Sequence, residues 1–284
     1  LRSQETFLGK WKVALDARWP YQVHLHSTYF HPVGYAMTAR QLSLGLDEQG
    51  VSVSYEYLYG PGTVYPVAEL RDKSSGVYRI EVIKQRPIPG PRVPRLIYGQ
   101  GDAFDAVTEG YRIGYTMLET TGVPAEWIEQ CNRLDELWVP TPFNEWTFRR
   151  SGATVPMRVM PLGLVDTNYF NLGIKSAKID GVYTFLSVFE WGERKSPEIL
   201  LRAFNRAFRS NDPVALICRY SNRDPDVNPA EIIRSLKLDP NGGRIVYSEN
   251  EPVPYYQMGQ IYRSVDCFVL PTRGEGWGMP IIEA

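Results

Sequence analysis

The sequence predicts an α/β protein in which two halves each form a mostly parallel sheet. Apolar strand patterns alternate with helical patterns along the chain, and such alternation favours parallel strands joined by right-handed crossovers. Glycines interrupt this alternation between residues 161 and 181, which marks a seam between the halves. With 284 residues the chain is long enough for two domains of ordinary size. We therefore expect domains at residues 1–162 and 163–284.

In the first half, residues 23–26 and 51–55 predict two strands around a helix at 36–49. The helix carries apolar residues at helical spacing and is expected to end at Gly50. Residues 59–101 are rich in proline and glycine, so no regular element is expected there. The pattern then resumes, with strands expected at 112–117, 137–139 and 157–160 and helices at 124–134 and 142–150.

The second half shows a cleaner alternation. Strands are expected at 183–189, 214–218, 245–247 and 267–270, and helices at 196–208, 229–238 and 254–265. Ser196 and Asn228 each precede a proline and are expected to cap the helices that follow. The chain stops at Ala284 within the first turn of a further helix, so we expect the natural protein to continue and the second domain to be incomplete.

Composition describes a soluble protein without a nucleic-acid surface. Hydrophobic residues make up 43% of the chain and charged residues 22%, as in globular domains. The net charge of −1 gives no basic field for nucleic acid. The longest apolar run has about five residues, against the roughly 20 that span a bilayer. Cys131, Cys218 and Cys267 lie far apart and are expected to be buried free thiols of a cytoplasmic protein, with peripheral contact at the inner membrane face left open.

The most informative segment is residues 274–283, where Glu275 and Glu283 flank a glycine turn. It follows the expected strand at 267–270, and strand, turn and helix is where an α/β sheet binds phosphate. The turn consists of Gly276, Trp277, Gly278 and Met279. Glycine lets the backbone approach a ligand closely, and a helix that begins at Pro280 favours an anion. Carboxylates are good partners for hydroxyls, so the segment indicates a nucleotide-sugar site.

A second motif covers residues 189–197, between the carboxyl end of a strand and the start of a helix. That is the ligand side of a parallel sheet. Arg194 and Lys195 at this place can neutralise the charge of a diphosphate leaving group. A basic pair on a solvated turn is the alternative, and the first motif favours the functional interpretation.

These stretches resemble the retaining glycosyltransferases of family 4, the glycosyl transferases group 1, which have the GT-B fold. Residues 160–170 are similar to the family's seam segment, and residues 185–204 to the strand, basic pair and helix that follow it. Residues 269–283 resemble the family's signature. Residues 113–119 and 135–141 resemble a subgroup of the same family, so the resemblance covers residues 110–284 well and the first hundred loosely.

The resemblance implies two Rossmann-like domains that face each other across a cleft. It implies a hexosyltransferase that uses a UDP-, GDP- or ADP-linked sugar, retains the anomeric configuration, and needs no metal or other cofactor. The acceptor would be a glycan, a lipid or a small molecule, held by the first domain. Arg194 and Lys195 would hold the diphosphate, and Glu283 the ribose. Glu275, as a catalytic carboxylate, and the turn backbone would hold the donor sugar, while Gly34 would approach the diphosphate from the other side.

The sequence departs from the family pattern at two places besides its end. Phe189 occupies the region where many members carry an arginine, so phosphate binding would depend on Arg194 and Lys195. The stretch at residues 115–120 lacks the histidine that touches the donor sugar in many members. Glu119 is the carboxylate of that stretch, and we assign it a catalytic role at the donor.

Two further clusters were weighed as metal sites. His24 and His26 share a strand face, but no carboxylate or cysteine is expected close by, so a strand pair lining the interdomain cleft is favoured over a metal site. Asp224 and Asp226 flank a proline in a polar loop, which favours a solvated turn. We therefore expect no metal ligands.

Three functions remain open at this point. The first is a retaining glycosyltransferase. The second is a related GT-B enzyme, such as a phosphorylase with a lysine-bound cofactor or a nucleotide-sugar epimerase that needs no acceptor. The third is a nucleotide-sugar-binding domain without catalysis, which Phe189 and the missing histidine would favour.

Overall fold

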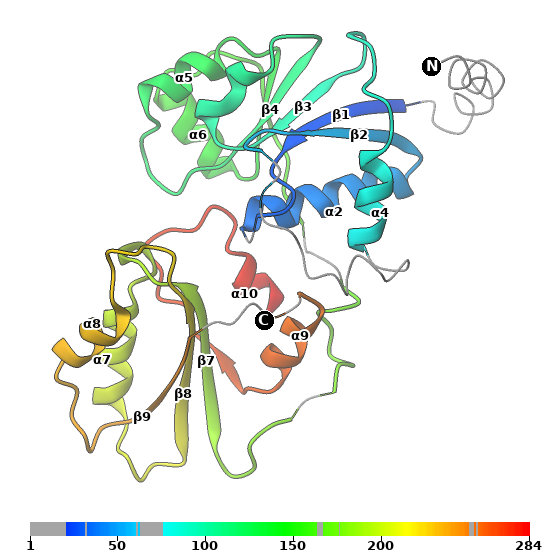
Figure 1. The fold of residues 1–284 in the computed structure, drawn as a ribbon. Coiled ribbons are helices and arrows are strands. Elements are labelled where there is room, and N and C mark those ends of the chain that lie inside the picture. The colour runs from blue at the N-terminus through cyan, green and yellow to red at the C-terminus, as the bar shows by residue number, and fades with distance from the viewer. Residues whose placement is uncertain are drawn as a thin grey trace. The chain divides into compact units, whose positions relative to one another are not determined.

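The computed structural model describes residues 21–31, 33–60, 62, 76–163, 167–175, 177–249, 253 and 255–284. By its internal contacts the chain divides into two compact units, Leu1–Gly163 and Leu164–Ala284. Each unit has its own sheet, and in both sheets all neighbouring strands run parallel (Figure 1). Residues 164–166 of the seam segment lie outside the described residues.

The first unit is built on six strands in the order β2-β1-β3-β4-β5-β6. Its strands are β1 (Tyr21–Ser27), β2 (Val51–Tyr57), β3 (Arg95–Tyr98), β4 (Arg112–Tyr115), β5 (Glu136–Val139) and β6 (Met157–Val159). Its helices are α2 (Gly34–Glu48), α4 (Gly76–Lys84), α5 (Ala125–Cys131) and α6 (Pro142–Arg150), with the 3-10 helix η1 (Gly101–Ala106). Five strands and three helices match the expected segments, and α2 is followed by Gly50 at φ 81° as expected.

Alternation along the strands gives the sheet of the first unit two packed faces. One face packs Leu25 and Val53 against α2 and α4. The other face packs Ile97 and Leu137 against η1, α5 and α6. Consecutive residues of a strand point to opposite faces. The even-numbered residues of β1 therefore lie on the η1 and α5 side.

The expectation of no regular structure between residues 59 and 101 is wrong. Helix α4 and strand β3 lie in this stretch, and β3 is central, between β1 and β4. The proline-rich part, residues 87–94, is the connection between them. The strand begins directly after Pro94, and its four residues are all buried.

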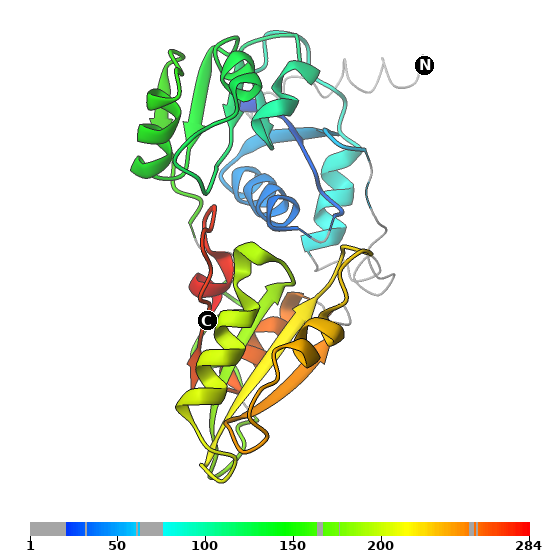
Figure 2. The ribbon, with the colours of Figure 1, turned by 90° about the vertical axis from the view of Figure 1, so that its left-hand side faces the viewer.

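The second unit has four described strands in the order β10-β7-β8-β9. They are β7 (Tyr183–Glu190), β8 (Val214–Ser221), β9 (Arg244–Glu249) and β10 (Cys267–Phe268). Its helices are α7 (Pro197–Ala207), α8 (Pro229–Ser235), α9 (Tyr255–Arg263) and α10 (Met279–Glu283), with the 3-10 helix η2 (Glu193–Lys195). Helices α7 and α8 pack on one face of the sheet and α9 on the other (Figures 1 and 2). This is the doubly wound arrangement, whose ligand side lies at the carboxyl ends of the strands.

The two expected helix caps differ in outcome. The Asn228 side chain accepts a hydrogen bond from the Glu231 amide at 3.2 Å, which confirms the cap of α8. Ser196 precedes α7, but its hydroxyl makes no capping bond, because the residue is in the left-handed region at φ 52°. The Ser196 hydroxyl instead accepts a hydrogen bond from Arg273 Nε at 3.2 Å. Asp224 and Asp226 lie in an exposed turn, as expected, in which the Asp226 amide donates to Asp224 Oδ1 at 3.0 Å.

The cysteines are free thiols, as the sequence predicts. Cys131 and Cys218 are buried, and burial raises the pKa of each thiol to about 12. Cys267 is only partly buried. Within the described residues, no helix combines the length and the apolar character that crossing a bilayer requires.

Candidate functional site

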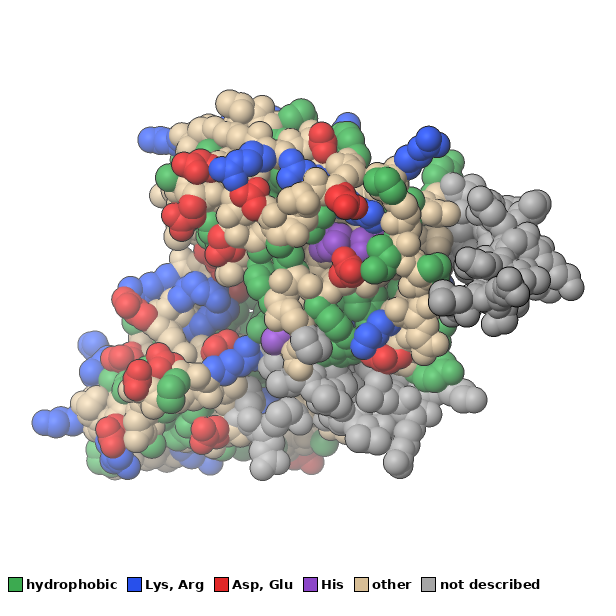
Figure 3. Space-filling model, turned by 45° about the horizontal axis from the view of Figure 1, so that its top comes forward, with side chains coloured by type: hydrophobic (Ala, Val, Ile, Leu, Met, Phe, Trp, Pro, Cys, Tyr) green, Lys and Arg blue, Asp and Glu red, His purple; other side chains and the backbone are tan. Residues whose placement is uncertain are grey.

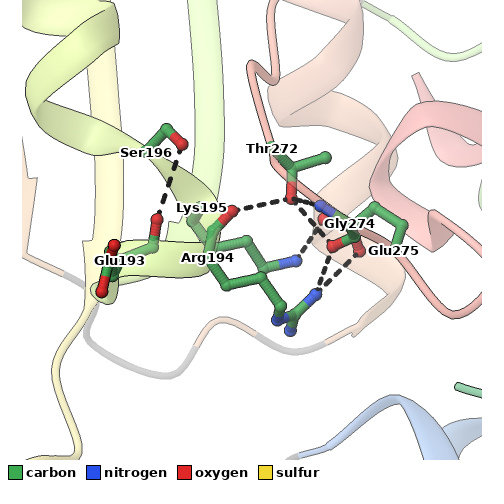
Figure 4. A network of polar contacts seen from close by, with 7 residues as sticks. All are labelled: Glu193, Arg194, Lys195, Ser196, Thr272, Gly274 and Glu275. Carbon is green, nitrogen blue, oxygen red and sulfur yellow. Dashed lines mark hydrogen bonds and ion pairs between the residues drawn. The ribbon is translucent and has the colours of Figure 1, made fainter. Parts of the chain in front are cut away.

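Strands β7 and β10 are neighbours, and the loops that follow them carry the two sequence motifs. The register pairs Cys267 with Phe185 and Phe268 with Leu186. Beyond the strands, the Arg273 amide donates to the Arg194 carbonyl at 2.8 Å, which fixes the two loops against each other. The Thr272 hydroxyl lies 3.2 Å from the same carbonyl oxygen and 3.0 Å from that of Gly274 (Figure 4).

Three predicted site residues meet between these loops. Lys195 Nζ lies 2.5 Å from Glu275 Oε1, although the two residues are 80 positions apart. Arg194 Nη1 donates to the Gly274 carbonyl at 2.7 Å and lies 3.6 Å from Glu275 Oε2 (Figure 4). The side chains of Lys195 and Glu275 are only 13% and 17% exposed, whereas that of Arg194 is 48% exposed. The Glu275 carboxylate therefore interacts with the positive charges of both Lys195 and Arg194, and about half of the Arg194 side chain remains exposed to solvent.

A second pair of contacts fastens the basic turn. Arg273 Nη1 lies 2.7 Å from Glu193 Oε1, and Arg273 Nε bonds the Ser196 hydroxyl. Ser196 holds a positive φ, which is uncommon for a residue with a side chain and recurs at ligand sites. The sequence motif named Arg194 and Lys195 but not Arg273, whose role appears only when the two loops are adjacent.

The glycine turn needs glycine for its backbone angle. Gly278 lies at φ 72° directly before α10, and a Cβ there would have ordinary contacts of 3.5 Å or more. The left-handed angle, which costs residues with a Cβ about 1–2 kcal/mol, is therefore the constraint. Trp277 and Met279 on either side are partly buried, and Gly276 lies between Trp277 and Glu275.

Glu283 lies one turn into α10 and is 9% exposed. Tyr262 of α9 donates its phenolic hydrogen to Glu283 Oε2 at 3.0 Å. Burial raises the pKa of Tyr262, and the charge and hydrogen bond of Glu283 raise it further, so the phenol remains a donor. Tyr262 was not predicted as a site residue, since it belongs to no motif and reaches Glu283 only through the packing of α9.

The two predicted residues of the first unit follow the carboxyl ends of parallel strands of its sheet. Gly34 opens α2 after β1, and no atom beyond its chain neighbours lies within 4 Å of a Cβ built there. Glu119 follows β4. Burial raises the pKa of Tyr35, the residue after Gly34, to about 12, and the charge of Glu119 contributes to this shift. The structure thus gathers Gly34 and Glu119 in the first unit, and Arg194, Lys195, Glu275, the turn and Glu283 in the second.

Comparison with solved structures identifies the fold. A sucrose-phosphate synthase from Thermosynechococcus elongatus matches with a TM-score of 0.62 at 14% identity, over 93% of this chain and 78% of that chain. An E. coli trehalose-6-phosphate protein bound with UDP-2-fluoro glucose matches with 0.63 at 12% identity, over 92% and 80%. WaaG, a glycosyltransferase of lipopolysaccharide biosynthesis, matches with 0.56 at 12% identity, over 92% and 78%. No family model and no curated protein matches the sequence.

With parallel sheets, crossover helices and these neighbours, the chain has the GT-B fold of two Rossmann-like domains. The fold class expected from the sequence is therefore confirmed. A fold of this kind serves many reactions, so the function has to be argued from the site.

Proposed function

We propose that the chain is a retaining glycosyltransferase that moves a hexosyl group from a nucleoside diphosphate sugar to an acceptor. The observation that carries the proposal is the meeting of Arg194, Lys195 and Glu275 at the carboxyl ends of β7 and β10. Two cations that can bind a diphosphate lie within 4 Å of a carboxylate that can bind sugar hydroxyls, and all three side chains lie beside the glycine turn. A structural neighbour bound with UDP-2-fluoro glucose supports a nucleotide sugar as donor.

The proposed chemistry follows from where charge develops. Cleavage of the anomeric C–O bond leaves the electron pair on the diphosphate and positive charge on the sugar ring. Arg194 and Lys195 would stabilise the diphosphate, and Glu275 would hold the sugar hydroxyls beside the ring. The leaving phosphate takes the proton of the acceptor hydroxyl as the new bond forms on the same face. In this proposal no metal takes part, and Glu119 acts on the donor from the first unit.

Glu283 is proposed to bind the ribose. Its carboxylate is buried and already oriented by Tyr262, which leaves little to reorganise when two adjacent hydroxyls arrive. Glu283→Ala should weaken nucleotide binding by about 1.5–3 kcal/mol, the contribution of a hydrogen bond to a charged group.

The first experiment is a calorimetric titration with UDP, GDP and ADP. We expect one nucleotide to bind, with affinity lost in Glu283→Ala and kept in Glu231→Ala, a control that removes an exposed carboxylate from α8. Equal affinity of the wild type and Glu283→Ala would contradict the ribose role. The sugar conjugates of the nucleotide that binds are then the donors to test.

Turnover separates the proposed reaction from its alternatives. Donor consumption that requires an acceptor, with sugar phosphates tested first because two structural neighbours are named for sugar phosphates, supports transfer. NMR of the product gives the anomeric configuration, and an inverted product would contradict retention. Turnover of donor without acceptor and without hydrolysis would identify an epimerase instead, and binding with no turnover a non-catalytic domain.

A further inference from the structure

The register of β1 and β2 brings four polar side chains to one face of the first sheet. His24 pairs with Ser54, and His26 pairs with Glu56. Alternate residues of a strand share a face, so these four point away from the core of Leu25 and Val53. The expectation that no carboxylate lies close to these histidines is wrong, because Glu56 lies on the neighbouring strand.

Distances within this cluster suit a metal ion. Glu56 Oε2 lies 3.4 Å from His24 Nε2 and 3.7 Å from His26 Nδ1. These are long for hydrogen bonds. A tetrahedral zinc ion with bonds of about 2.0–2.2 Å holds neighbouring ligand atoms about 3.4 Å apart. One ligand atom from each of the three residues lies within 4.8 Å of the other two.

A buried nitrogen without a hydrogen-bond partner supports the same conclusion. His24 and His26 are 1% and 8% exposed, and among the described residues His24 Nε2, the atom that faces Glu56, has no hydrogen-bond partner. The Ser54 hydroxyl lies 2.8 Å from His24 Nδ1. In the tautomer that carries its proton on Nδ1, this hydroxyl accepts the hydrogen bond, and the lone pair of Nε2 faces Glu56. A lone pair and a carboxylate oxygen repel each other unless a cation lies between them.

The ligand types and the nearby charge of Arg95 together limit which ion fits this cluster. Arg95 pairs with His24 from β3, and its charge opposes a cation beside the two imidazoles. Hard ions such as Mg²⁺ and Ca²⁺ need several oxygen ligands, whereas imidazole suits zinc and its neighbours in the first transition row. Arg95 Nη1 is also buried without a partner among the described residues, so an anion is the rival ligand.

We propose that His24, His26 and Glu56 bind one zinc-class divalent ion that joins β1 to β2. The fourth ligand position would be filled by water from the side of Glu56, whose side chain is 48% exposed. Figure 3 shows histidine side chains, in purple, with acidic side chains, in red, beside them on the visible face. Three protein ligands and an open position characterise zinc sites that bind a further small ligand.

The test is titration of the metal-stripped full chain with Zn²⁺ by calorimetry and with Co²⁺ by visible absorption. We expect one site with a tetrahedral Co²⁺ spectrum. Glu56→Gln keeps the half-exposed side chain's shape and should weaken Zn²⁺ binding by more than the roughly 10- to 100-fold typical of a lost outer-shell partner. Ser54→Ala, which removes such a partner from His24, should weaken it within that range. Glu126→Gln, the same charge change at an exposed position of α5, is the matched control and should bind like the wild type.

Three outcomes would overturn the proposal. One is the absence of saturable Zn²⁺ binding to the wild type. Another is wild-type affinity in Glu56→Gln, which would place the ion elsewhere. The third is binding of inorganic phosphate that Glu56→Gln strengthens, because loss of a carboxylate favours an anion beside Arg95.

Discussion

At the scale of single residues, Glu275 has two roles that oppose each other. It is proposed to hold sugar hydroxyls, yet it also neutralises Lys195 at 2.5 Å. A diphosphate without its sugar must compete with this carboxylate for the same ammonium group. Glu275→Gln should therefore raise the affinity for the free nucleoside diphosphate about tenfold, since a charged hydrogen bond contributes about 1.5–3 kcal/mol and 1.4 kcal/mol is tenfold. The same variant should lose sugar transfer.

Calorimetry measures the expected gain in nucleotide affinity of Glu275→Gln, and a donor-turnover assay measures its expected loss of sugar transfer. Glu193→Gln is the matched control, because its exposed carboxylate contacts Arg273 rather than Lys195. A parallel loss of nucleotide affinity and of turnover in Glu275→Gln would show that the carboxylate holds the basic loop in place and does not compete with the diphosphate.

Tyr262 is expected to act on the nucleotide through Glu283. Tyr262→Phe removes one hydrogen bond and no packing volume, so the protein should fold with a loss of about 0.5–1.5 kcal/mol in nucleotide binding. In Glu283→Ala the hydroxyl has no ligand-binding partner left, and adding Tyr262→Phe should cost no further affinity. The double-mutant cycle measures this coupling, and additive losses would contradict it.

At the scale of elements, helix α2 gives a clean test of the predicted donor contact in the first unit. Gly34 and Gly45 both lie in α2, and a Cβ would meet no atom within 4 Å at either position. Gly45→Ala should stabilise the helix by up to about 1 kcal/mol and leave donor binding unchanged. Gly34→Ala should fold equally well but weaken donor binding, if the diphosphate approaches this backbone. Denaturant titration and calorimetry measure the two quantities, and unchanged donor affinity in Gly34→Ala would remove Gly34 from the site.

Helix α9 orients Tyr262 and depends on a glycine. A Cβ on Gly259 would overlap the Tyr169 carbonyl oxygen. Gly259→Ala should therefore destabilise the second unit by about 1–3 kcal/mol, the usual cost of overpacking, although alanine is the better helix former. Chemical denaturation would measure the loss. A stabilised variant would show that α9 and Tyr169 are not in contact.

Elements with strong local signals could be predicted, and those defined by distant partners could not. Helix α6 was expected at its observed limits, with a stop at Gly152, and the structure shows that its start is also set locally, by Pro142 and by the cap at Thr141. Strand β3 has four residues and no local signal beyond Pro94, so only its place between β1 and β4 makes it a strand. The same holds for side chains. Glu275 belongs to a motif, but Glu56 was placed one residue past an expected strand end, and its proximity to His26 exists only in the paired sheet.

At the scale of the whole molecule, the two units should respond to acid in different pH ranges. Burial, with the charges of His24 and Arg95, lowers the pKa of His26 from 6.5 to about 3. The unfolded chain therefore binds a proton that the folded unit does not, and the first unit loses stability as the pH falls from about 6.5 towards 3. In the second unit, Lys178 and the Thr184 amide lower the pKa of Asp266 from 3.8 to about 2. That contribution is complete above about pH 4 and is lost only as the pH falls towards 2.

Scanning calorimetry with a chelator present, as the pH is lowered from 7 to 3, should show two unfolding transitions. The midpoint temperature of one should fall early, from about pH 6.5, and that of the other late, below about pH 4. His26→Gln should flatten the early change, and Asp266→Asn should remove part of the late one. Transitions that fall together over the whole range would contradict this assignment.

The pairing of β7 with β10 also has a consequence for biosynthesis. Lys195 and Glu275 are 80 residues apart, so at roughly 5–20 residues per second Lys195 leaves the ribosome about 4–16 s before its carboxylate. During that interval β7 can pair with β8 on one side, while its other edge presents unpaired N–H and C=O groups. The nascent second unit thus exposes an open strand edge beside the proposed donor site until β10 is made. A chaperone would protect the chain at this edge, and premature association would begin there.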